Sequence, residues 1–259
     1  MRPGLPRFTL FVRRCIGRTG VERSAGSGGG TRRAHAAMLA AALVLLAGCG
    51  SIAPRDDRVT RVELLALLQT LNADLLSHDS ATLTLERWCA DHRLADPARI
   101  TARRVRGAQP PLPDALRAQL ALQGDEPVAY RHVQLVCGGH VLSEADNWYV
   151  PARLSAAMNE RLDTSDEPFG KVVKPLGFQR LTLSAELLWS PLPPGWEMQD
   201  APSARAPLRM PRFVLRHAAV LRDAAQRPFS VVVENYTAEL FSFGAWAPLV
   251  AAPQAYSRN

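Results

Sequence analysis

The sequence lacks the residue patterns that mark metal, phosphate and nucleophile sites. The histidines after residue 49 are His78, His92, His132, His140 and His217; they show neither H-x-H nor H-E-x-x-H spacing, and no C-x-x-C pair occurs. G-x-S-x-G is absent, and the glycine run in "SAGSGGG" does not stand between a strand and a helix. We therefore expect no metal site and no cofactor, and neither a phosphate-binding loop nor a nucleophile elbow is supported.

An excess of positive charge is missing from most of the chain. The whole sequence carries 31 Lys and Arg against 24 Asp and Glu, a formal net charge of +7. Residues 1–48 hold eight of the arginines and one acid, Glu22, so the remainder has 23 residues of each sign and no net charge. A neutral body lacks the electrostatic footprint of a nucleic-acid-binding protein. We therefore expect no nucleic acid among its partners.

An apolar run long enough to cross a bilayer is also missing. Residues 34–48, "AHAAMLAAALVLLAG", follow two arginines and end in small residues before Cys49. This order of basic, apolar and small residues is typical of an export signal. "LAGC" resembles a bacterial lipobox, which implies cleavage before Cys49 and a lipid on its sulfur. The sequence thus predicts a disordered leader and signal over 1–48 and an exported, lipid-anchored protein on the periplasmic face of a membrane, with Gly50 favouring the outer membrane. The alternative is an N-terminal apolar helix with an incidental cysteine.

The chain after a linker over 49–58 is predicted to form a single domain, 59–259. Leucines spaced i, i+4, i+7 and i+11 predict an amphipathic helix near its start, and Asp79 or Ser80 can cap a second helix. Helix patterns come first and strand patterns come late, without βαβ alternation. This order predicts an α+β fold with an antiparallel sheet of about six strands packed with helices. Residues 191–212 hold six prolines and are predicted to be a loop insertion; we expect a monomer.

Arg131 lies within an apolar strand pattern. Alternate residues of a strand share a face, so Arg131 shares one with Val133, Leu135 and Cys137. A buried arginine is costly unless something pairs with it. Arg131 therefore either reaches out to water from the start of the strand or forms a guanidinium fork that awaits a planar carboxylate.

Glu234 raises the same question near the end of the chain. It closes the run "FSVVVE", which is apolar on both faces and predicts a central strand. A carboxyl group there is partly desolvated. It is either able to donate or share a proton or paired with a strand neighbour such as Arg216.

Two cysteines remain in the predicted domain, Cys89 and Cys137. An exported protein can bridge them by a disulfide. Both lie on predicted apolar faces, where buried free thiols are equally expected. The sequence leaves both alternatives open.

Four segments, in order, resemble the chorismate lyase family, whose enzymes remove pyruvate from chorismate to give 4-hydroxybenzoate. "DSAT" (79–82) resembles the start of the family's early helix, and "YRHVQLVCGG" (130–139) resembles the strand whose arginine holds the product carboxylate. "DEPFGK" (166–171) resembles a Pro-Leu-Gly turn, and "RPFSVVVE" (227–234) resembles the final strand with its terminal glutamate. The resemblance spans 60–240 and implies a chorismate lyase-like fold, which also serves as the effector-binding domain of some transcription regulators.

The resemblance implies a ligand site and a lyase reaction that needs no cofactor. Arg131 would bind the ring carboxylate. Glu234 would meet the 4-position oxygen and protonate or steer the departing enolpyruvate. Further substrate-binding residues would be Ser80, Ala81, Phe169 and Gly170. Ala81 and Phe169 stand where the family has methionine and leucine, an exchange that roughly keeps the pocket volume.

The chain also departs from the family. Asp146 and Asn147 stand where the family strand carries Gly-Arg, so a cation is lost and an acid gained, which weakens binding of the second carboxylate of chorismate. The insertion 191–212 is a candidate to reshape the mouth of the pocket. The sequence thus predicts a chorismate lyase, a carbon–oxygen lyase. The alternatives are an exported, lipid-anchored module that binds an aromatic carboxylate without catalysis, and a structural envelope lipoprotein.

Overall fold

The computed structural model describes residues 56–107, 109–199 and 208–250. They belong to one compact unit, Ser51–Asn259. The predicted leader and Cys49 lie outside the described residues, so the structure does not bear on the predicted lipid anchor. In the described ranges no helix is both long and apolar enough to cross a membrane, and no group of at least three His, Cys, Asp or Glu is placed to hold a metal ion.

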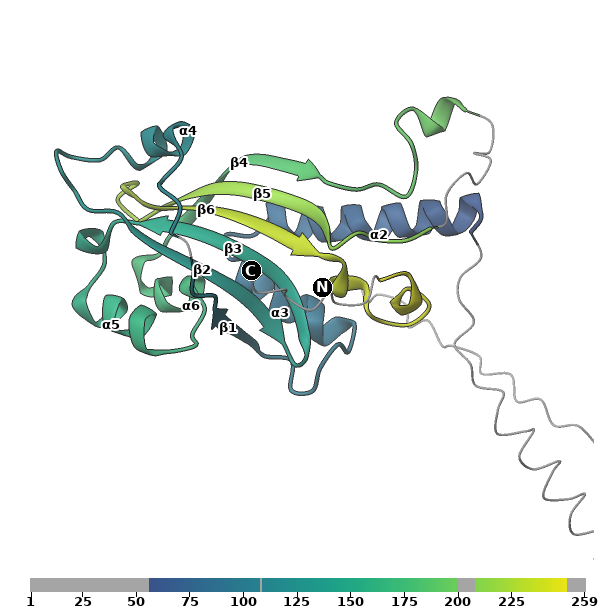
Figure 1. The fold of residues 1–259 in the computed structure, drawn as a ribbon, viewed down its shortest axis with the longest axis horizontal. Coiled ribbons are helices and arrows are strands. Elements are labelled where there is room, and N and C mark those ends of the chain that lie inside the picture. The colour runs from purple at the N-terminus through teal and green to yellow at the C-terminus, as the bar shows by residue number, and fades with distance from the viewer. Residues whose placement is uncertain (1–55, 108, 200–207, 251–259) are drawn as a thin grey trace, which may run out of the picture. The chain divides into compact units, whose positions relative to one another are not determined.

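The centre of the fold is a six-stranded sheet in the order β1-β2-β3-β6-β5-β4 (Figure 1). Each neighbouring pair of strands is antiparallel. This confirms the predicted α+β class with about six antiparallel strands. The strands are β1 (Ile100–Arg104), β2 (Ala129–Cys137), β3 (His140–Tyr149), β4 (Gln179–Leu187), β5 (Phe213–Arg222) and β6 (Pro228–Thr237).

The helices begin where the sequence offers capping side chains. Asp57 accepts a hydrogen bond from the backbone N–H of Thr60 at the start of the first long helix, and Ser80 accepts one from Leu83 at the start of the second. Of the two predicted caps of the second helix, Ser80 is therefore the one used. The α-helices are α2 (Arg58–Leu76), α3 (Ala81–Asp91), α4 (Asp114–Arg117), α5 (Ala156–Thr164) and α6 (Phe169–Val172).

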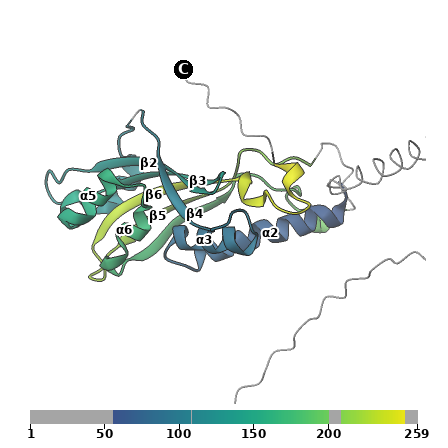
Figure 2. The same cartoon turned by 90° about the horizontal axis from the view of Figure 1, so that it is seen from below.

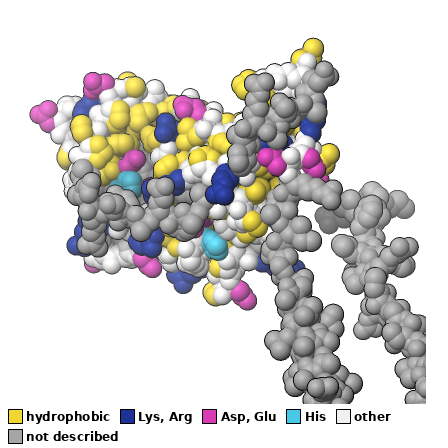
Figure 3. All heavy atoms as spheres, turned by 45° about the vertical axis from the view of Figure 1, so that its right-hand side comes forward, with side chains coloured by type: hydrophobic (Ala, Val, Ile, Leu, Met, Phe, Trp, Pro, Cys, Tyr) yellow, Lys and Arg dark blue, Asp and Glu magenta, His cyan; other side chains and the backbone are white. Residues whose placement is uncertain are grey.

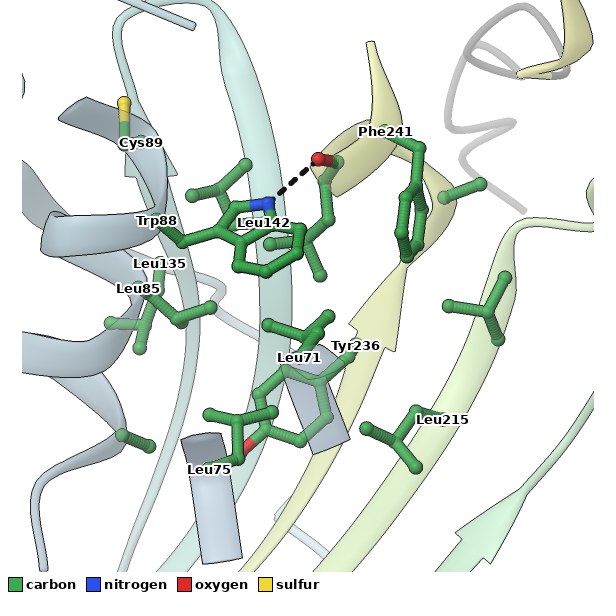
Figure 4. Close-up of a cluster of buried hydrophobic side chains, with 14 of the residues drawn as sticks. Leu71, Leu75, Leu85, Trp88, Cys89, Leu135, Leu142, Leu215, Tyr236 and Phe241 are labelled. Atoms are coloured by element: carbon green, nitrogen blue, oxygen red, sulfur yellow. Dashed lines mark hydrogen bonds between the residues drawn. The ribbon is translucent and has the colours of Figure 1, made fainter. Parts of the chain in front are cut away.

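The main hydrophobic core lies between one face of the sheet, here called the inner face, and the helices α2 and α3 (Figures 1 and 2). Leu71 of α2 and Leu85 of α3 are fully buried against Tyr236 of β6 (Figure 4). Burying one such leucine contributes about 1.5–3 kcal/mol. The indole Nε1 of Trp88 donates a hydrogen bond to the carbonyl of Leu240 at 2.9 Å, which satisfies its polar atom inside this core.

Smaller clusters complete both faces. At the other end of the inner face, α5 and α6 pack Leu162 and Phe169 against Phe229 of β6. On the opposite, outer face, Leu112 and Leu120 cover part of the sheet.

Figure 3 shows hydrophobic side chains on one face of the molecule with cationic and acidic side chains scattered among them. This mixture of signs agrees with the net neutrality of the chain after residue 48.

A disulfide between Cys89 of α3 and Cys137 of β2 ties the second helix to the sheet. Both cysteines are fully buried, so the bridged alternative holds and the free-thiol alternative does not. Next to it, β2 turns into β3 at Gly138, whose φ of +56° favours glycine. A Cβ atom there would lie 2.6 Å from the Cβ of Ala95, so the turn also needs the absence of a side chain. The β2–β3 hairpin therefore turns at Gly138.

Candidate functional site

A cavity of about 50 Å³ lies between the inner face of the sheet and the starts of α3 and α6. Strands β2, β3, β4, β5 and β6 all contribute side chains to it. The residues that the sequence assigned to a ligand site all line it; they are Ser80, Ala81, Arg131, Phe169, Gly170 and Glu234. The structure thus brings the predicted set together around one cavity, and the roles assigned to its members stay predictions.

The start of α3 forms one wall of this cavity. Ala81 and Thr82 line it directly after the capping Ser80. Gly170 of α6 approaches closely here, because a Cβ atom at this position would lie 3.3 Å from the Ser80 hydroxyl and 3.4 Å from that of Thr82. Glycine therefore lets α6 pack against the first turn of α3. The backbone N–H groups of a helix start favour negative charge, so this wall suits an anion.

Arg131 supplies a buried cation with unused hydrogen-bond donors. Only 4% of the residue is exposed, so the alternative in which it reaches out to water is wrong. Its terminal nitrogens donate to the carbonyl of Glu167 at 3.3 and 3.4 Å, and its Nε has no partner among the residues that the structure describes. Burial, with the nearby charge of Arg104, lowers the pKa of Arg131 to about 10, so the group stays protonated at neutral pH. It forms no ion pair with any described residue.

Glu234 is already paired. Its carboxylate accepts a hydrogen bond from Arg180 at 2.6 Å and another from the hydroxyl of Tyr236 at 3.0 Å. The side chains of Arg180 and Glu234 are 4% and 7% exposed. Burial, the largest single influence, lowers the pKa of Arg180, but the charge of Glu234, its hydrogen bond and the nearby Tyr236 and Asp79 together raise it, so Arg180 is protonated at neutral pH.

One expectation for Glu234 is corrected by this geometry. The paired alternative is right, but the partner is Arg180 and not Arg216, which donates instead to Asn235 at 2.9 Å. Arg180 and Tyr236 both donate to the same oxygen of Glu234, Oε2. The catalytic role assigned to Glu234 stays a prediction.

Sequence reasoning missed Arg180 and Phe178, which also line the cavity. One signal pointed to Arg180, because a glutamate buried in a central strand requires a cation nearby. The sequence could not choose that cation, because Arg180 lies on β4 and β5 separates it from the β6 strand of Glu234. Only the strand order shows that β4 and β6 are separated by a single strand, which the long side chain of Arg180 can cross to reach Glu234.

Asp146 is not part of the cavity. Strand pairing sets Arg131 opposite Asn147 and His132 opposite Asp146, so neighbouring residues point to opposite faces. Asn147 faces the cavity. Asp146 instead accepts hydrogen bonds from the Tyr130 hydroxyl at 2.6 Å and pairs with His132 Nδ1 at 2.7 Å. The expectation that Asp146 adds an acid to the ligand site is therefore wrong.

The proline-rich insertion lies against α2. Arg58 donates to the carbonyl of Gln199 at 3.1 Å, and Arg61 donates to that of Pro191 at 2.7 Å. None of the described residues of 191–199 or 208–212 lines the cavity. The described part of the insertion thus does not form its mouth.

The sheet topology, its helices and the buried cavity define this chain as an α+β domain built on a six-stranded antiparallel sheet. By sequence, it is 54% identical over 190 residues to the uncharacterized protein y4mC of Sinorhizobium fredii (strain NBRC 101917 / NGR234), covering 72% of this chain and 80% of that protein. The chain belongs to the same family as y4mC. No family model matches it.

The solved structures to which it is similar are transcription regulators. PhnF from Mycobacterium smegmatis has a TM-score of 0.43 at 14% identity, covering 83% of this chain and 99% of PhnF. The ligand-binding domain of a putative GntR-family regulator from Bordetella bronchiseptica gives 0.35 at 17% identity, covering 53% and 82%. The possible regulator YydK from Bacillus subtilis gives 0.34 at 16% identity, covering 60% of this chain and 61% of YydK, less than two thirds of its length.

These comparisons correct the functional prediction. The solved structures named above are regulators or regulator domains, and the assignment to the chorismate lyase family and to its lyase activity is not supported. The comparisons also give no support to a lipoprotein signal, to a membrane partner or to a lipid-anchored binding module. The lipid on Cys49 stays an untested prediction.

Proposed function

We propose that this domain binds a small monocarboxylate in the cavity beside Arg131 and does not change it chemically. The observation that carries the proposal is the state of Arg131, which is buried, charged and without an ion-pair partner in the described residues. A buried cation of this kind is costly until an anion pairs with it. A carboxylate matches the flat fork of a guanidinium and can accept two of its hydrogen bonds at once.

The other lining residues indicate the size and polarity of the part of the ligand that carries the carboxylate. Val133, Leu221 and Val232 give it an apolar lining, and Phe169 and Phe178 add aromatic rings. Its volume of about 50 Å³ is smaller than the ~150 Å³ of an apolar cavity that holds benzene. A compact aliphatic acid therefore fits with little rearrangement. The aromatic acid predicted from the sequence requires a side chain such as Phe178 to move.

The proposal of binding without catalysis is supported by the pairing of Glu234, the buried carboxylate among the described lining residues. Glu234 is neutralised by Arg180 and fixed by Tyr236. A general acid or base must be free to exchange a proton with the ligand. Among the described lining residues, His and Cys are absent and Asp79 lies exposed with one oxygen accepting from the backbone N–H of Arg180.

Calorimetric titration of the full-length chain tests this proposal. The probes are acetate, isobutyrate and benzoate, with isobutyramide as a neutral control of the same shape. We expect saturable binding of the acids and none of the amide. In Arg131→Met the affinity should fall by at least about thirtyfold, because truncating one member of a buried charge pair costs about 2–5 kcal/mol.

Arg216→Gln is the matched control, since this arginine lies on the sheet but outside the cavity. It should bind the acids like the unchanged protein. Equal affinity of the acids for Arg131→Met and for the control would overturn the proposal. So would recovery of a chemically altered acid after prolonged incubation, followed by proton NMR.

We also propose that the domain works in an oxidising compartment. The support is the buried disulfide between Cys89 and Cys137, a bond that is rare in reducing cytosol. Alkylation of the protein taken directly from its host, followed by mass spectrometry, tests this proposal. We expect both cysteines to be blocked before reduction and alkylated after it. Two alkylated thiols before reduction would contradict it.

A further inference from the structure

A second cavity, of about 410 Å³, opens beside β2 where β1 ends. After the end of β1, the backbone N–H of Val105 still donates a hydrogen bond to the carbonyl of His132 in β2, at 3.0 Å. Beyond this point the edge of β2 is no longer covered by β1, whose pairing stops at Arg104. The cavity occupies this uncovered edge.

The lining of this cavity is strongly basic. Arg104, Arg106, Arg131 and His132 supply four basic side chains against one acid, Asp163. Asp163 is turned toward Arg104, at 3.4 Å. Arg106 is exposed and makes no hydrogen bond or ion pair in the described part of the chain. A concave surface with this balance of charge attracts anions.

His132 faces this cavity with one ring nitrogen already used. Its Nδ1 is paired with Asp146 at 2.7 Å, and the Tyr130 hydroxyl lies 3.3 Å from the same nitrogen. The Nε2 atom has no partner among the described residues. When the ring is protonated, Nε2–H is therefore a free, charged hydrogen-bond donor at a basic cavity.

We propose that this cavity is a second ligand site, which binds an oxyanion group through Arg106 and through Nε2–H of protonated His132. Arg131 lines both this cavity and the carboxylate cavity on the inner face, but the two donors proposed here, Arg106 and His132, line only the second cavity of the two. The chemistry is shared by phosphate, sulfate and carboxylate groups, since each presents oxygens to charged donors.

Binding at this site depends on the charge of His132. The groups that face it are Tyr130 on its own strand, Asp146 and Glu144 on β3, and Arg212 before β5. The hydrogen bond to Asp146 raises the pKa of His132 above its ordinary value, despite burial and Arg212, which lower it. A neutral ring whose Nδ1–H is held by Asp146 turns a lone pair at Nε2 toward the ligand. The affinity should therefore fall as pH rises through the pKa of His132.

Sulfate is the probe of choice, because its charge is constant over the range in which histidine titrates. Calorimetric titration of the full-length chain in low-salt buffer should show saturable binding at about pH 6 and weaker binding at about pH 9. Arg106→Gln and His132→Gln should each weaken binding at about pH 6 by roughly tenfold or more. Acetate in place of sulfate shows whether a tetrahedral or a planar oxyanion binds more tightly.

Two further variants keep the proposal falsifiable. Arg209→Gln removes an exposed arginine outside the cavity and should leave sulfate binding unchanged. Asp146→Asn keeps His132 but removes its counter-ion, so the pH at which sulfate binding is half lost should move to lower values. The absence of saturable sulfate binding would overturn the proposal, as would equal losses in Arg106→Gln and Arg209→Gln. Benzoate affinity at the Arg131 cavity should not change in Arg106→Gln, so the two sites can fail separately.

Discussion

Two adjacent residues of β2, Arg131 and His132, show that charged side chains have different environments on the two faces of this sheet. Arg131 points to the inner face, where it is 4% exposed and makes hydrogen bonds only to one backbone carbonyl. His132 points to the outer face, where its side chain is 25% exposed and is bound to Asp146. The inner face thus holds a desolvated charge with unused donors. The outer face holds a paired charge with access to water.

The histidines of the two faces make the same contrast. His217 of β5 is fully buried on the inner face, and burial lowers its pKa to about 4, although Glu234 acts in the opposite direction. The hydrogen bond to Asp146 raises the pKa of His132. One residue type therefore acquires opposite shifts because desolvation dominates on the inner face and pairing dominates on the outer one. Substitution of a charged residue should therefore change the free energy of unfolding more on the inner face than on the outer face.

The largest perturbation is expected for the inner ion pair. Arg180→Met leaves the carboxylate of Glu234 buried without its cation, and breaking a buried pair in this way costs about 3–5 kcal/mol. The free energy of unfolding of the full-length chain, from urea titration at neutral pH, measures the loss. The double variant Arg180→Met/Glu234→Gln should recover part of it, because no unpaired charge is then buried.

Arg216→Met is the control for this prediction, because its partner Glu186 is exposed and lies 3.9 Å away. An exposed pair of this kind contributes about 0–1 kcal/mol. A loss in Arg180→Met no larger than that in Arg216→Met would show that the inner face tolerates an unpaired carboxylate.

The next effect is the pH dependence that His217 gives to stability. Its Nε2 and the side-chain oxygen of Asn72 are 2.9 Å apart, and no described residue is a hydrogen-bond partner of its Nδ1. The unfolded chain binds a proton here below about pH 6.5, whereas the folded chain does so only near the lowered pKa of about 4. The free energy of unfolding should therefore rise between these values, by about 3 kcal/mol for this residue alone.

Urea unfolding at a series of pH values between these limits measures this slope. His217→Gln keeps a side chain that can hydrogen-bond to Asn72 but does not titrate. It should therefore remove most of the rise attributed to His217. An unchanged slope in the variant would place the acid sensitivity in other residues.

The sequence predicted the sheet because its signals are local. Alternation places Arg131 on the same face as Val133 and Leu135, and all three line the inner cavity. The glycine pair 138–139 fixes the β2–β3 turn, whose direction decides which residues face each other. These features depend on a few neighbouring residues, so they can be read without knowing the rest of the fold.

The charge partners could not be predicted because they depend on strand order and register. For Glu234 the sequence left two alternatives, a proton-donating role or an ion pair with Arg216. Its partner is instead Arg180 of β4, whose side chain reaches Glu234 across β5. The sequence does not show that β4 lies beside β5. Asp146 was placed near the ligand site together with Asn147 because the two stand where the chorismate lyase strand carries Gly-Arg, although a shift of one residue along a strand changes the face. The sequence could therefore gather the residues of the inner cavity but could not say which of its charges are free.

The smallest effect is expected for the outer pair of His132 and Asp146. The raised pKa of His132 means that its stabilising contribution is fully present below the unfolded value and is lost as pH rises through the folded one. Burial alone would raise the pKa of Asp146, but hydrogen bonds from His132 and Tyr130 lower it. Its contribution is therefore present above the unfolded carboxylate value and is lost as pH falls.

Asp146→Asn should thus lower the free energy of unfolding by about 0.5–1 kcal/mol at about pH 5.5, and by less at about pH 9, where His132 is neutral. NMR titration of the His132 ring in the same variant should show a lower pKa. Glu186→Gln, which removes an exposed partner of Arg216, should give no such pH dependence. A loss in Asp146→Asn that grows toward high pH would mean that Asp146 acts mainly through Tyr130, and the contrast between the two faces would then not rest on the charge of His132.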